Sequence, residues 1–294
     1  MSLIVKKEDI EVSKNLFILI YGQPASYKST TALSAKNPLL FDIERGCQRI
    51  NREWQCDTVQ PETYSQLLEV LEKEDLSSYS TLVFDTLLAL NDLCMDEILK
   101  TQPTLVQKDG SPSLKAYGQA KVKFKALVEK LASMNKTIIF VAHSIEQKNQ
   151  DEIEIRTDSS SSAIREITKK LDVMAYISVV GNKKFMNFKP TSRYYAKPIQ
   201  GVPDQIEIPV LEEGQANTFL QDMVINPAIE YRKKGAKKKA TYDDILKQAR
   251  KIIADKGVTE ESRAELRKLD KIGDSQEQIK NMIDEWNKKN VAKA

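Results

Sequence analysis

The sequence predicts an α/β fold with a mainly parallel central sheet, an antiparallel edge and a small C-terminal helical domain. Between residues 16 and 143, short apolar segments alternate with segments whose apolar residues recur at helical spacing. This alternation is typical of right-handed βαβ units, whose parallel strands gather ligands at their carboxyl ends. Two later apolar segments flank Gly181-Asn182 and predict a hairpin at the edge of the sheet.

The individual elements follow from the same patterns. Short apolar runs predict core strands over residues 16–21, 38–42, 54–59, 80–85 and 136–143. Apolar residues at helical spacing predict helices over residues 28–36, 62–74, 86–100 and 117–134. Proline and Asp-Gly predict a loop over residues 101–113, whereas the polar, serine-rich residues 144–162 predict a mobile segment. The hairpin strands are predicted over residues 172–180 and 184–189.

Charge is distributed unevenly along the chain, although its 294 residues carry a net charge of only +3. Residues 231–294 contain 18 Lys and Arg against 11 Asp and Glu, whereas residues 1–230 carry a net charge of −4. We therefore predict a core domain over residues 1–230, a basic linker over residues 231–240 and a small helical domain over residues 241–294. The linker contains six cations within eight residues, which suit either a phosphate backbone or a solvated hinge.

Composition argues against several classes of protein. The longest apolar runs are far shorter than the about 20 residues that span a bilayer, and the first residues lack a signal-peptide pattern. The three cysteines, Cys47, Cys56 and Cys94, form no C-x-x-C pair and predict neither a disulfide framework nor a zinc site. We therefore expect a soluble, intracellular protein with reduced thiols.

The clearest motif is a phosphate-binding loop between the first predicted strand and the first predicted helix. Its sequence is Gly22-Gln23-Pro24-Ala25-Ser26-Tyr27-Lys28-Ser29-Thr30. A strand that turns into a helix at such a loop directs backbone N–H groups and the helix dipole at one point, where an anion binds. Lys28 would reach the β- and γ-phosphates of a nucleotide, Ser29 would bind Mg²⁺, and Thr30 would lie near the nucleotide.

Tyr27 departs from the usual pattern G-x-x-x-x-G-K-[ST], which has glycine before the lysine. A side chain at this position restricts the backbone and can crowd the phosphates or cover the nucleotide. The alternative interpretation of the whole segment is an ordinary turn between a strand and a helix.

Acidic residues end two of the predicted strands. Asp85 ends the strand over residues 80–85, where a carboxylate can hold Mg²⁺ directly or through a water molecule. Asp42 and Glu44 flank Ile43 and point to the same side of an extended chain, so one of them could polarise an attacking water. The alternative for each is an ordinary solvated acid at a strand end or a surface turn.

Three further residues are candidates for the site. His143, the only histidine, ends an apolar strand and is either a hydrogen-bonded residue of the core or rim, or a sensor of the γ-phosphate or bound DNA. Arg193 and Lys197 lie in a stretch of cations and aromatics that includes Tyr194 and Tyr195. These cations could reach a neighbouring subunit's phosphates or grip nucleic acid, or they could protect an edge strand.

Taken together, these motifs resemble the RecA-like ATPases of phages and prophages, and among them the Sak-group single-strand annealing proteins, a family often described as AAA-type ATP-binding proteins. The resemblance extends over residues 16–209 and excludes the basic tail. It rests on residues 22–30, 41–46, 82–85, 116–120, 141–143 and 193–197.

The resemblance implies a RecA-like P-loop NTPase core that self-associates in the cytoplasm of a bacterial host, as a ring or filament with ATP between subunits. It implies a nucleotide and Mg²⁺ site made of the Walker A residues and the Walker B acid, namely Lys28, Ser29, Thr30 and Asp85. Glu44 or Asp42 would be the acid after the second strand, and His143 the polar sensor. Arg193 and Lys197 would be cations supplied to a neighbouring subunit.

We therefore expect an ATP- and Mg²⁺-dependent recombination ATPase that binds and pairs single-stranded DNA, with phage or host replication proteins as further partners and no membrane association. Two other classes stay open at this point. One is a DNA-binding scaffold or replication accessory protein that binds ATP and hardly hydrolyses it, which Tyr27 favours. The other is a small-molecule kinase that uses the same loop.

Overall fold

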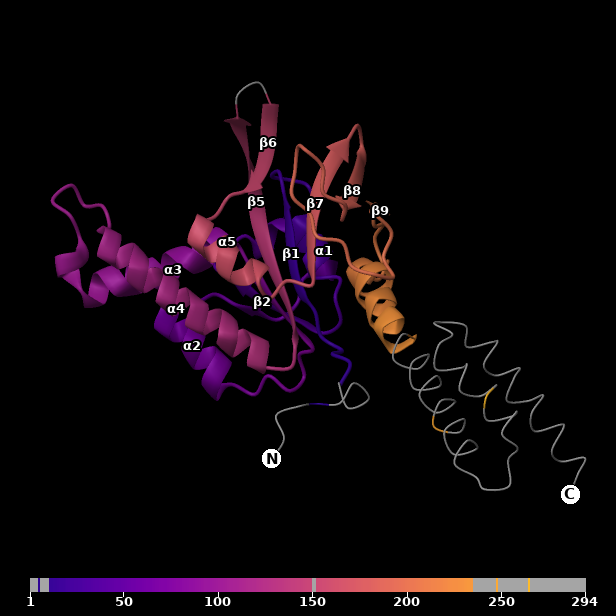
Figure 1. Ribbon diagram of the computed structural model, residues 1–294, viewed down its shortest axis with the longest axis horizontal. Coiled ribbons are helices and arrows are strands. Elements are labelled where there is room, and N and C mark those ends of the chain that lie inside the picture. Colours follow the sequence, from indigo (N-terminus) through magenta and orange to yellow (C-terminus); the bar gives the residue numbers. More distant parts are fainter. Residues whose placement is uncertain (1–4, 6–10, 150–151, 235–246, 248–263, 265–294) are drawn as a thin grey trace, which may run out of the picture. The chain divides into compact units, whose positions relative to one another are not determined.

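The computed structural model describes most of the first 234 residues and little of the rest (Figure 1): the described residues are 5, 11–149, 152–234, 247 and 264. Contacts divide the chain into a large unit, Ser13–Glu230, and a second unit made of Met1–Val12 and Tyr231–Ala294. Almost all of the second unit lies outside the described residues, so the predicted basic linker and small helical domain stay predictions. The first residues of that linker, 231–234, are helical.

The large unit is built on one mixed β-sheet. The described residues contain nine strands of this sheet: β1 (Phe17–Gly22), β2 (Pro38–Asp42), β3 (Thr58–Val59), β4 (Thr81–Asp85), β5 (Thr137–Asn149), β6 (Glu152–Thr157), β7 (Val173–Val180), β8 (Lys183–Asn187) and β9 (Gln205–Ile208). Their order is β3-β2-β4-β5-β1-β7-β8-β9, and β6 pairs with β5 outside this path. The strands from β3 to β7 in this order are parallel, whereas β6, β8 and β9 pair antiparallel. The predicted α/β fold, mainly parallel with an antiparallel edge, is therefore confirmed.

Helices lie on both sides of the sheet (Figure 1). The α-helices are α1 (Lys28–Ala32), α2 (Tyr64–Lys73), α3 (Leu87–Thr101), α4 (Leu114–Ser133) and α5 (Ser161–Thr168). Three short 3-10 helices are η2 (Cys47–Arg49), η3 (Arg52–Trp54) and η4 (Pro103–Leu105). Residues 219–234 are also helical and include the π-helical turn η5 (Gln221–Ile225).

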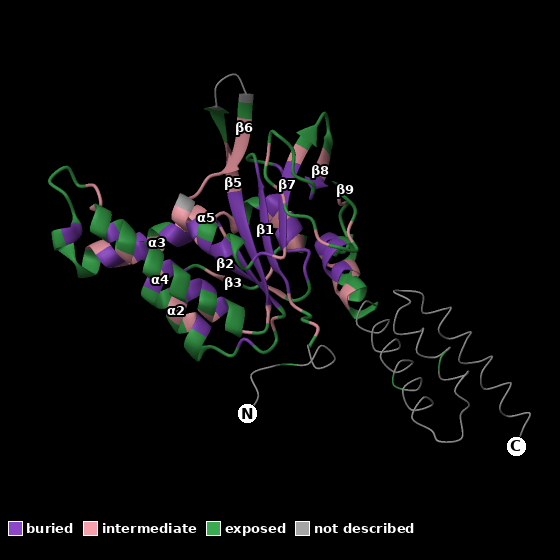
Figure 2. Ribbon diagram, viewed as in Figure 1, coloured by how far each residue is buried: buried purple, intermediate pink, exposed green. Residues whose placement is uncertain are grey.

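The central strand β1 is buried on both faces and separates two apolar cores. Phe17, Leu19 and Tyr21 join a cluster with residues of α2, α3, α4 and α5, whereas Ile18 and Ile20 join a cluster with residues of α1 and of the last helical segment. Parallel sheets covered by helices on both faces have strands of this continuous apolar kind. Figure 2 shows the result, in which buried strands lie between helices that expose their outer surfaces.

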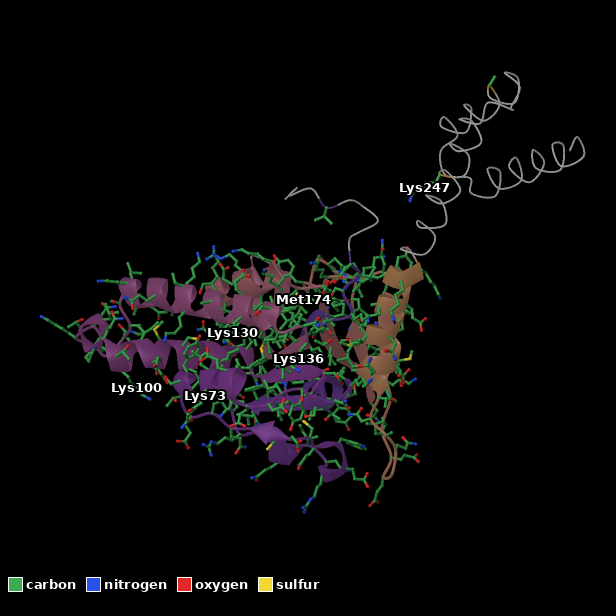
Figure 3. The ribbon with its side chains drawn as sticks, turned by 90° about the horizontal axis from the view of Figure 1, so that it is seen from below. Lys73, Lys100, Lys130, Lys136, Met174 and Lys247 are labelled. Carbon is green, nitrogen blue, oxygen red and sulfur yellow. The ribbon has the colours of Figure 1, made fainter. Side chains whose placement is uncertain are left out.

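The outer surface of the helical layer is charged. Lys130 of α4 forms an ion pair with Glu72 of α2 at 2.8 Å. Lys73 and Lys100 extend from the outer surface, whereas Lys136 lies further inside (Figure 3). The Lys136 ammonium donates hydrogen bonds of 2.7 and 2.5 Å to two backbone carbonyls of the turn before β4. Because exposed ion pairs contribute only about 0.2–1 kcal/mol each, the buried apolar clusters stabilise this layer more than its surface charges do.

The expectation of a mobile segment over residues 144–162 is wrong. Among the described residues of this segment, 144–149 extend β5, 152–157 form β6 and 161–162 begin α5. Strands β5 and β6 pair antiparallel, from the pair Ser144 and Thr157 to the pair Asn149 and Glu152. Figure 1 shows this hairpin reaching beyond the end of β1. Its strand β6 alternates Ile153 and Ile155 with polar residues, which is the pattern of a half-buried strand, and Ile155 packs against the core. The serines also have a structural role, because Ser160 Oγ accepts a 3.2 Å hydrogen bond from the Ala163 N–H and caps α5.

Other boundaries differ from the sequence expectations. The first strand of the predicted hairpin, β7, is parallel to β1, so only β8 and β9 form the antiparallel edge beyond it. The predicted strand over residues 54–59 is reduced to the two residues of β3, because Trp54 belongs to η3 and residues 55–57 lie in no strand. The first helix ends at Ala32 rather than residue 36. By contrast, β2 has the predicted bounds.

Candidate functional site

The carboxyl ends of the neighbouring strands β2, β4, β5 and β1 meet at one edge of the sheet and border a cavity of about 570 Å³. Residues 24–30 of the predicted phosphate-binding loop line this cavity. Strand register brings the other predicted residues there, because β2 and β4 pair Asp42 with Asp85 while β1 and β5 pair Gly22 with His143. The cavity is also lined by Asp42, Glu44, Asp85 and His143.

Close packing requires glycine where β1 ends and the loop begins. A Cβ atom on Gly22 would lie 2.8 Å from the carbonyl oxygen of Ile177 and 2.9 Å from Ser26 Oγ. Contacts that short do not occur for real Cβ atoms, so a side chain here would displace β7 or the loop. Gly22 therefore permits the tight turn from β1 into the loop.

The loop accommodates Tyr27 by an unusual backbone conformation. Tyr27 has φ 66° and ψ 22°, the left-handed region that favours glycine, and Ala25 also has a positive φ of 61°. Tyr27 thus provides the conformation that glycine provides in the usual pattern. Its side chain is 42% exposed and lies on the wall of the cavity.

Lys28 is the first residue of α1, and it is buried. Only 6% of Lys28 is exposed, and its Nζ donates a 2.7 Å hydrogen bond to the carbonyl oxygen of Gln23 in the same loop. Burial lowers the pKa of Lys28, while the charges of Asp85 and Glu44 oppose this effect. The ammonium group therefore lies within the loop, between backbone dipoles and two carboxylates, where it can bind a phosphate group.

Ser29 and Asp85 form a pair next to this lysine. Ser29 Oγ donates a 2.5 Å hydrogen bond to Asp85 Oδ2. Burial raises the pKa of Asp85, the nearby charges of Glu44 and Asp42 raise it further, and the Ser29 hydrogen bond and the Lys28 charge lower it. A hydroxyl and a carboxylate oxygen at this distance are hard ligands of the kind that Mg²⁺ prefers.

The carboxylate of Asp42 is held by its own turn and by Gln60, which follows β3. Its carboxylate accepts hydrogen bonds from the backbone N–H groups of Gly46, at 2.7 Å, and Cys47, at 3.0 Å, and from Gln60 Nε2, at 3.0 Å. Burial alone would raise the pKa of Asp42, but these hydrogen bonds outweigh burial and hold the pKa below its usual value. The arrangement is that of a structural carboxylate that closes the turn after β2.

Glu44 faces the cavity with a less constrained carboxylate. Oε1 accepts a 2.5 Å hydrogen bond from Thr86 Oγ1, and Oε2 lies 3.7 Å from His143 Nε2. About a third of each side chain of this Glu–His pair is exposed. His143 Nδ1 is buried and has no hydrogen-bond partner among the described residues. Of the two predicted acids, Glu44 is therefore the one placed to contact a water molecule in the cavity.

The composition of the cavity wall fits a nucleoside triphosphate with Mg²⁺. Ser26 Oγ and Thr31 Oγ1 are buried at the loop and lack hydrogen-bond partners in the described part of the chain, so both can contact a polar ligand. Away from the loop the wall has an apolar part, as nucleobase sites commonly do; it includes Ile50, Trp54, Ile208, Pro209, Leu211 and Phe219. No cluster of three His, Cys, Asp or Glu suited to a metal occurs among the described residues, so Mg²⁺ would depend on Ser29, Asp85, phosphate oxygens and water.

Arg193 and Lys197 are not part of this cavity wall. Both residues are exposed, and the carbonyl oxygen of Arg193 accepts a 2.6 Å hydrogen bond from the Ile155 N–H of β6. The Lys197 ammonium donates a hydrogen bond to the carbonyl oxygen of Leu171. The structure therefore places the two cations beside β6 and β7, and a role in another subunit's site stays a prediction.

Several residues of the site carry no sequence signal. Thr86 is the N-cap of α3 and orients Glu44, and Asn217 donates a 2.8 Å hydrogen bond from Nδ2 to the carbonyl oxygen of Thr30. The cavity is also lined by Arg49 from η2 and by five residues that follow the loop by nearly 180 positions, namely Ile208, Pro209, Leu211, Asn217 and Phe219. Only the sheet topology brings those residues to the loop, so no local motif could reveal them.

The comparisons with known proteins agree with this geometry. A family model described as an AAA domain matches residues 14–198, which is more than half of the chain and includes the loop, the acids and His143. No curated protein matches the sequence. Among the described residues, no helix has the length and apolar character needed to cross a membrane.

Proposed function

The chain belongs to the AAA domain family of P-loop ATPases, and we propose that it is an ATP- and Mg²⁺-dependent phage-type recombination ATPase that binds and pairs single-stranded DNA. The observation that supports hydrolysis best is the position of Lys28, which is buried in the loop and lines the same cavity as Asp85 and Glu44. Asp85 is tied to Ser29, while Glu44 faces the cavity. These are the parts that phosphoryl transfer requires: a cation, two side chains that can bind one Mg²⁺ ion, and an acid that orients water.

Each residue has a defined role in the proposed reaction. The loop N–H groups and the Lys28 ammonium bind the β- and γ-phosphates and stabilise the charge that develops on them. Ser29 and Asp85 would hold Mg²⁺, and the metal would supply neutralisation of phosphate charge. Glu44 orients the attacking water and accepts its proton, and Thr86 fixes one carboxylate oxygen of Glu44. His143 lies near the other oxygen and can respond to the γ-phosphate.

DNA binding is proposed for the surface beside β6. Arg193 and Tyr195 are exposed there, and the Arg156 guanidinium carbon lies 3.6 Å from the centre of the Tyr195 ring. Aromatic rings next to cations stack on bases while the cations attract phosphates. Ile155 of β6 donates a hydrogen bond to the carbonyl of Arg193, and β5, the partner of β6, contains His143. A DNA contact at this surface would therefore be connected through one hairpin to the nucleotide cavity.

Self-association is proposed as the way in which Arg193 and Lys197 reach phosphates. Within one chain neither residue lines the cavity, so either could reach the phosphates of a bound nucleotide only in a neighbouring copy, with the nucleotide between subunits. Sedimentation of the protein with single-stranded oligonucleotide and a non-hydrolysable ATP analogue tests this directly. A protein that stays monomeric under all these conditions would contradict it.

Steady-state phosphate release, with and without single-stranded oligonucleotide, tests the function as a whole. We expect turnover that requires Mg²⁺, rises with the oligonucleotide and falls by about 10²-fold or more in Lys28→Ala, because that ammonium stabilises the transferring phosphoryl group. The matched control is Lys36→Ala, which removes an exposed lysine soon after α1. Equal loss in both variants, or full activity of Lys28→Ala, would contradict the assignment.

A nucleotide-binding scaffold with little hydrolysis is the second candidate, and the left-handed backbone of Tyr27 is the observation that favours it. A bulky residue beside Lys28 can support binding while limiting the approach of water. ATP binding without phosphate release in the presence of oligonucleotide would select this candidate.

A further inference from the structure

Tyr27 is held from outside the loop by a lysine of the antiparallel edge. The Nζ atom of Lys184 lies 3.8 Å from the centre of the Tyr27 ring, well within the range of a cation–π contact. Lys184 belongs to β8, where strand register places it between Val179 of β7 and Ile208 of β9. Within the described residues Lys184 has no acidic partner, whereas its neighbour Lys183 forms an ion pair with Glu207 at 3.0 Å.

The backbone of Tyr27 determines how the loop becomes a helix. Tyr27 is the N-cap of α1 and forms no side-chain capping hydrogen bond, but its carbonyl oxygen accepts a 2.8 Å hydrogen bond from the Thr31 N–H. Lys28 follows directly. A left-handed conformation at Tyr27 therefore precedes the residue that binds phosphate, and any change of this conformation would move Lys28.

A left-handed conformation is unfavourable for tyrosine, because its Cβ atom approaches the following carbonyl oxygen. Glycine avoids this cost, and the usual phosphate-binding loop has glycine here. In this chain a contact of the Tyr27 side chain can offset part of that cost. The Lys184 ammonium over the ring is such a contact, and it reaches the loop from a strand that contributes nothing else to the predicted motif.

We propose that Lys184 is a positioning residue for nucleotide binding. Its ammonium holds the Tyr27 ring against the β8 edge and so keeps the loop in the conformation that directs Lys28 into the cavity. This inference rests on the proposed function, since it concerns the binding of ATP by the same loop. It also explains how the chain tolerates tyrosine at a glycine position.

A double-mutant cycle between positions 27 and 184 tests the proposal. Lys184→Met keeps the length of the side chain and removes the charge, and we expect it to weaken ATP·Mg²⁺ binding about two- to fivefold, the effect of losing one cation–π contact. Lys184→Arg should restore binding, because guanidinium also stacks on aromatic rings. Lys183→Met is the matched control and should leave affinity unchanged.

The second arm of the cycle changes Tyr27. Tyr27→Phe keeps the ring, so Lys184→Met should still weaken binding in this background. Tyr27→Gly removes the ring, and glycine adopts the left-handed conformation without a stabilising side-chain contact. ATP binding should therefore be at least as tight as in the wild type, and Lys184→Met should have no effect in this background. An equal loss in the Tyr27→Gly background would overturn the proposal, because Lys184 would then act on the ligand directly.

A second double-mutant cycle separates this inference from the proposed function. The wild type, Lys184→Met, Tyr27→Gly and the double variant are unfolded by denaturant without nucleotide. The contact exists without a ligand, so the effects of Lys184→Met and Tyr27→Gly on the unfolding midpoint should be non-additive. Additive effects would overturn the proposal whatever the nucleotide result. If the wild type binds no ATP while the unfolding cycle shows coupling, the proposed function fails but the contact between Lys184 and the loop stands.

Discussion

Asp42 and Asp85 end adjacent parallel strands in register, yet they have opposite surroundings. Asp42 is 2% exposed and receives three hydrogen bonds from residues that follow β2 and β3, which lower its pKa. Asp85 receives a hydrogen bond from Ser29 of the phosphate-binding loop, and burial raises its pKa. The comparison teaches that the role of an acid at a strand end depends on which groups donate hydrogen bonds to it. Donors from the turn after β2 and from Gln60 give Asp42 a structural role, whereas the donor from the phosphate-binding loop makes Asp85 part of the candidate site.

Among the variants that test this comparison, Glu44→Gln should have the largest effect. Glu44 lines the cavity, whereas the carboxylate of Asp42 already accepts three hydrogen bonds. Because the glutamine side chain could not accept a proton, kcat should fall by about 10²–10⁴-fold with little change in ATP affinity. Phosphate-release kinetics together with a binding titration separate the two parameters. Glu62→Gln, which alters an exposed acid paired with Arg45, is the control. Unchanged kcat in Glu44→Gln would remove Glu44 from the reaction.

Asp85→Asn should have the next largest effect. We expect the Mg²⁺ concentration needed for half-maximal activity to rise about 10- to 100-fold, because the amide can still accept the hydrogen bond from Ser29 but lacks the charge that holds the metal. Stability at neutral pH should not fall, since the raised pKa means that the charged carboxylate is disfavoured in the folded state. Magnesium titrations of activity and unfolding curves measure both. A large loss of stability would place Asp85 in the same structural class as Asp42.

Asp42→Asn should show the reverse pattern. Replacing the carboxylate removes charge-assisted hydrogen bonds and should lower the free energy of unfolding by about 1.5–3 kcal/mol at pH 7, with a smaller effect on kcat than Glu44→Gln has.

The pH dependence of that loss gives an independent check. The folded-state pKa of Asp42 lies below its usual value, so its stabilising contribution is complete above the unfolded pKa near 3.9 and disappears as pH falls through the folded-state value. The difference between wild type and Asp42→Asn should therefore shrink below about pH 4. A difference that grows as pH falls would contradict the hydrogen-bond assignment.

The two cations of residues 193–197 extend the comparison, with the smallest expected effects. Lys197→Met should cost about 1 kcal/mol of stability, because the Lys197 ammonium donates to the carbonyl of Leu171. Arg193→Ala should change stability by less than about 0.5 kcal/mol, because it alters an exposed side chain. Arg193→Ala should instead reduce stimulation of ATP turnover by single-stranded DNA. Unaltered stimulation would remove Arg193 from the proposed DNA surface.

Much of the fold and the centre of the site could be predicted from the sequence, because local patterns determine them. The bounds of β2 and the loop before Lys28 follow from an apolar run and a phosphate-binding motif. The β5–β6 hairpin was missed although Ile153 and Ile155 alternate with polar residues, because the polar residues around this short alternation favour a loop. The choice between Asp42 and Glu44 could not be predicted, since the donors from Gly46, Cys47 and Gln60 become visible only once the turn is folded.

The central claim is that the loop after β1 binds a nucleoside triphosphate through Lys28. Calorimetric titration of ATP with Mg²⁺ into the wild type, Lys28→Ala and Lys36→Ala tests it most directly. We predict one site per chain in the wild type and in Lys36→Ala, with affinity at least about tenfold lower in Lys28→Ala because a buried charge-assisted contact is lost. Equal affinity of Lys28→Ala and wild type, or no binding by the wild type at millimolar ATP, would contradict the claim.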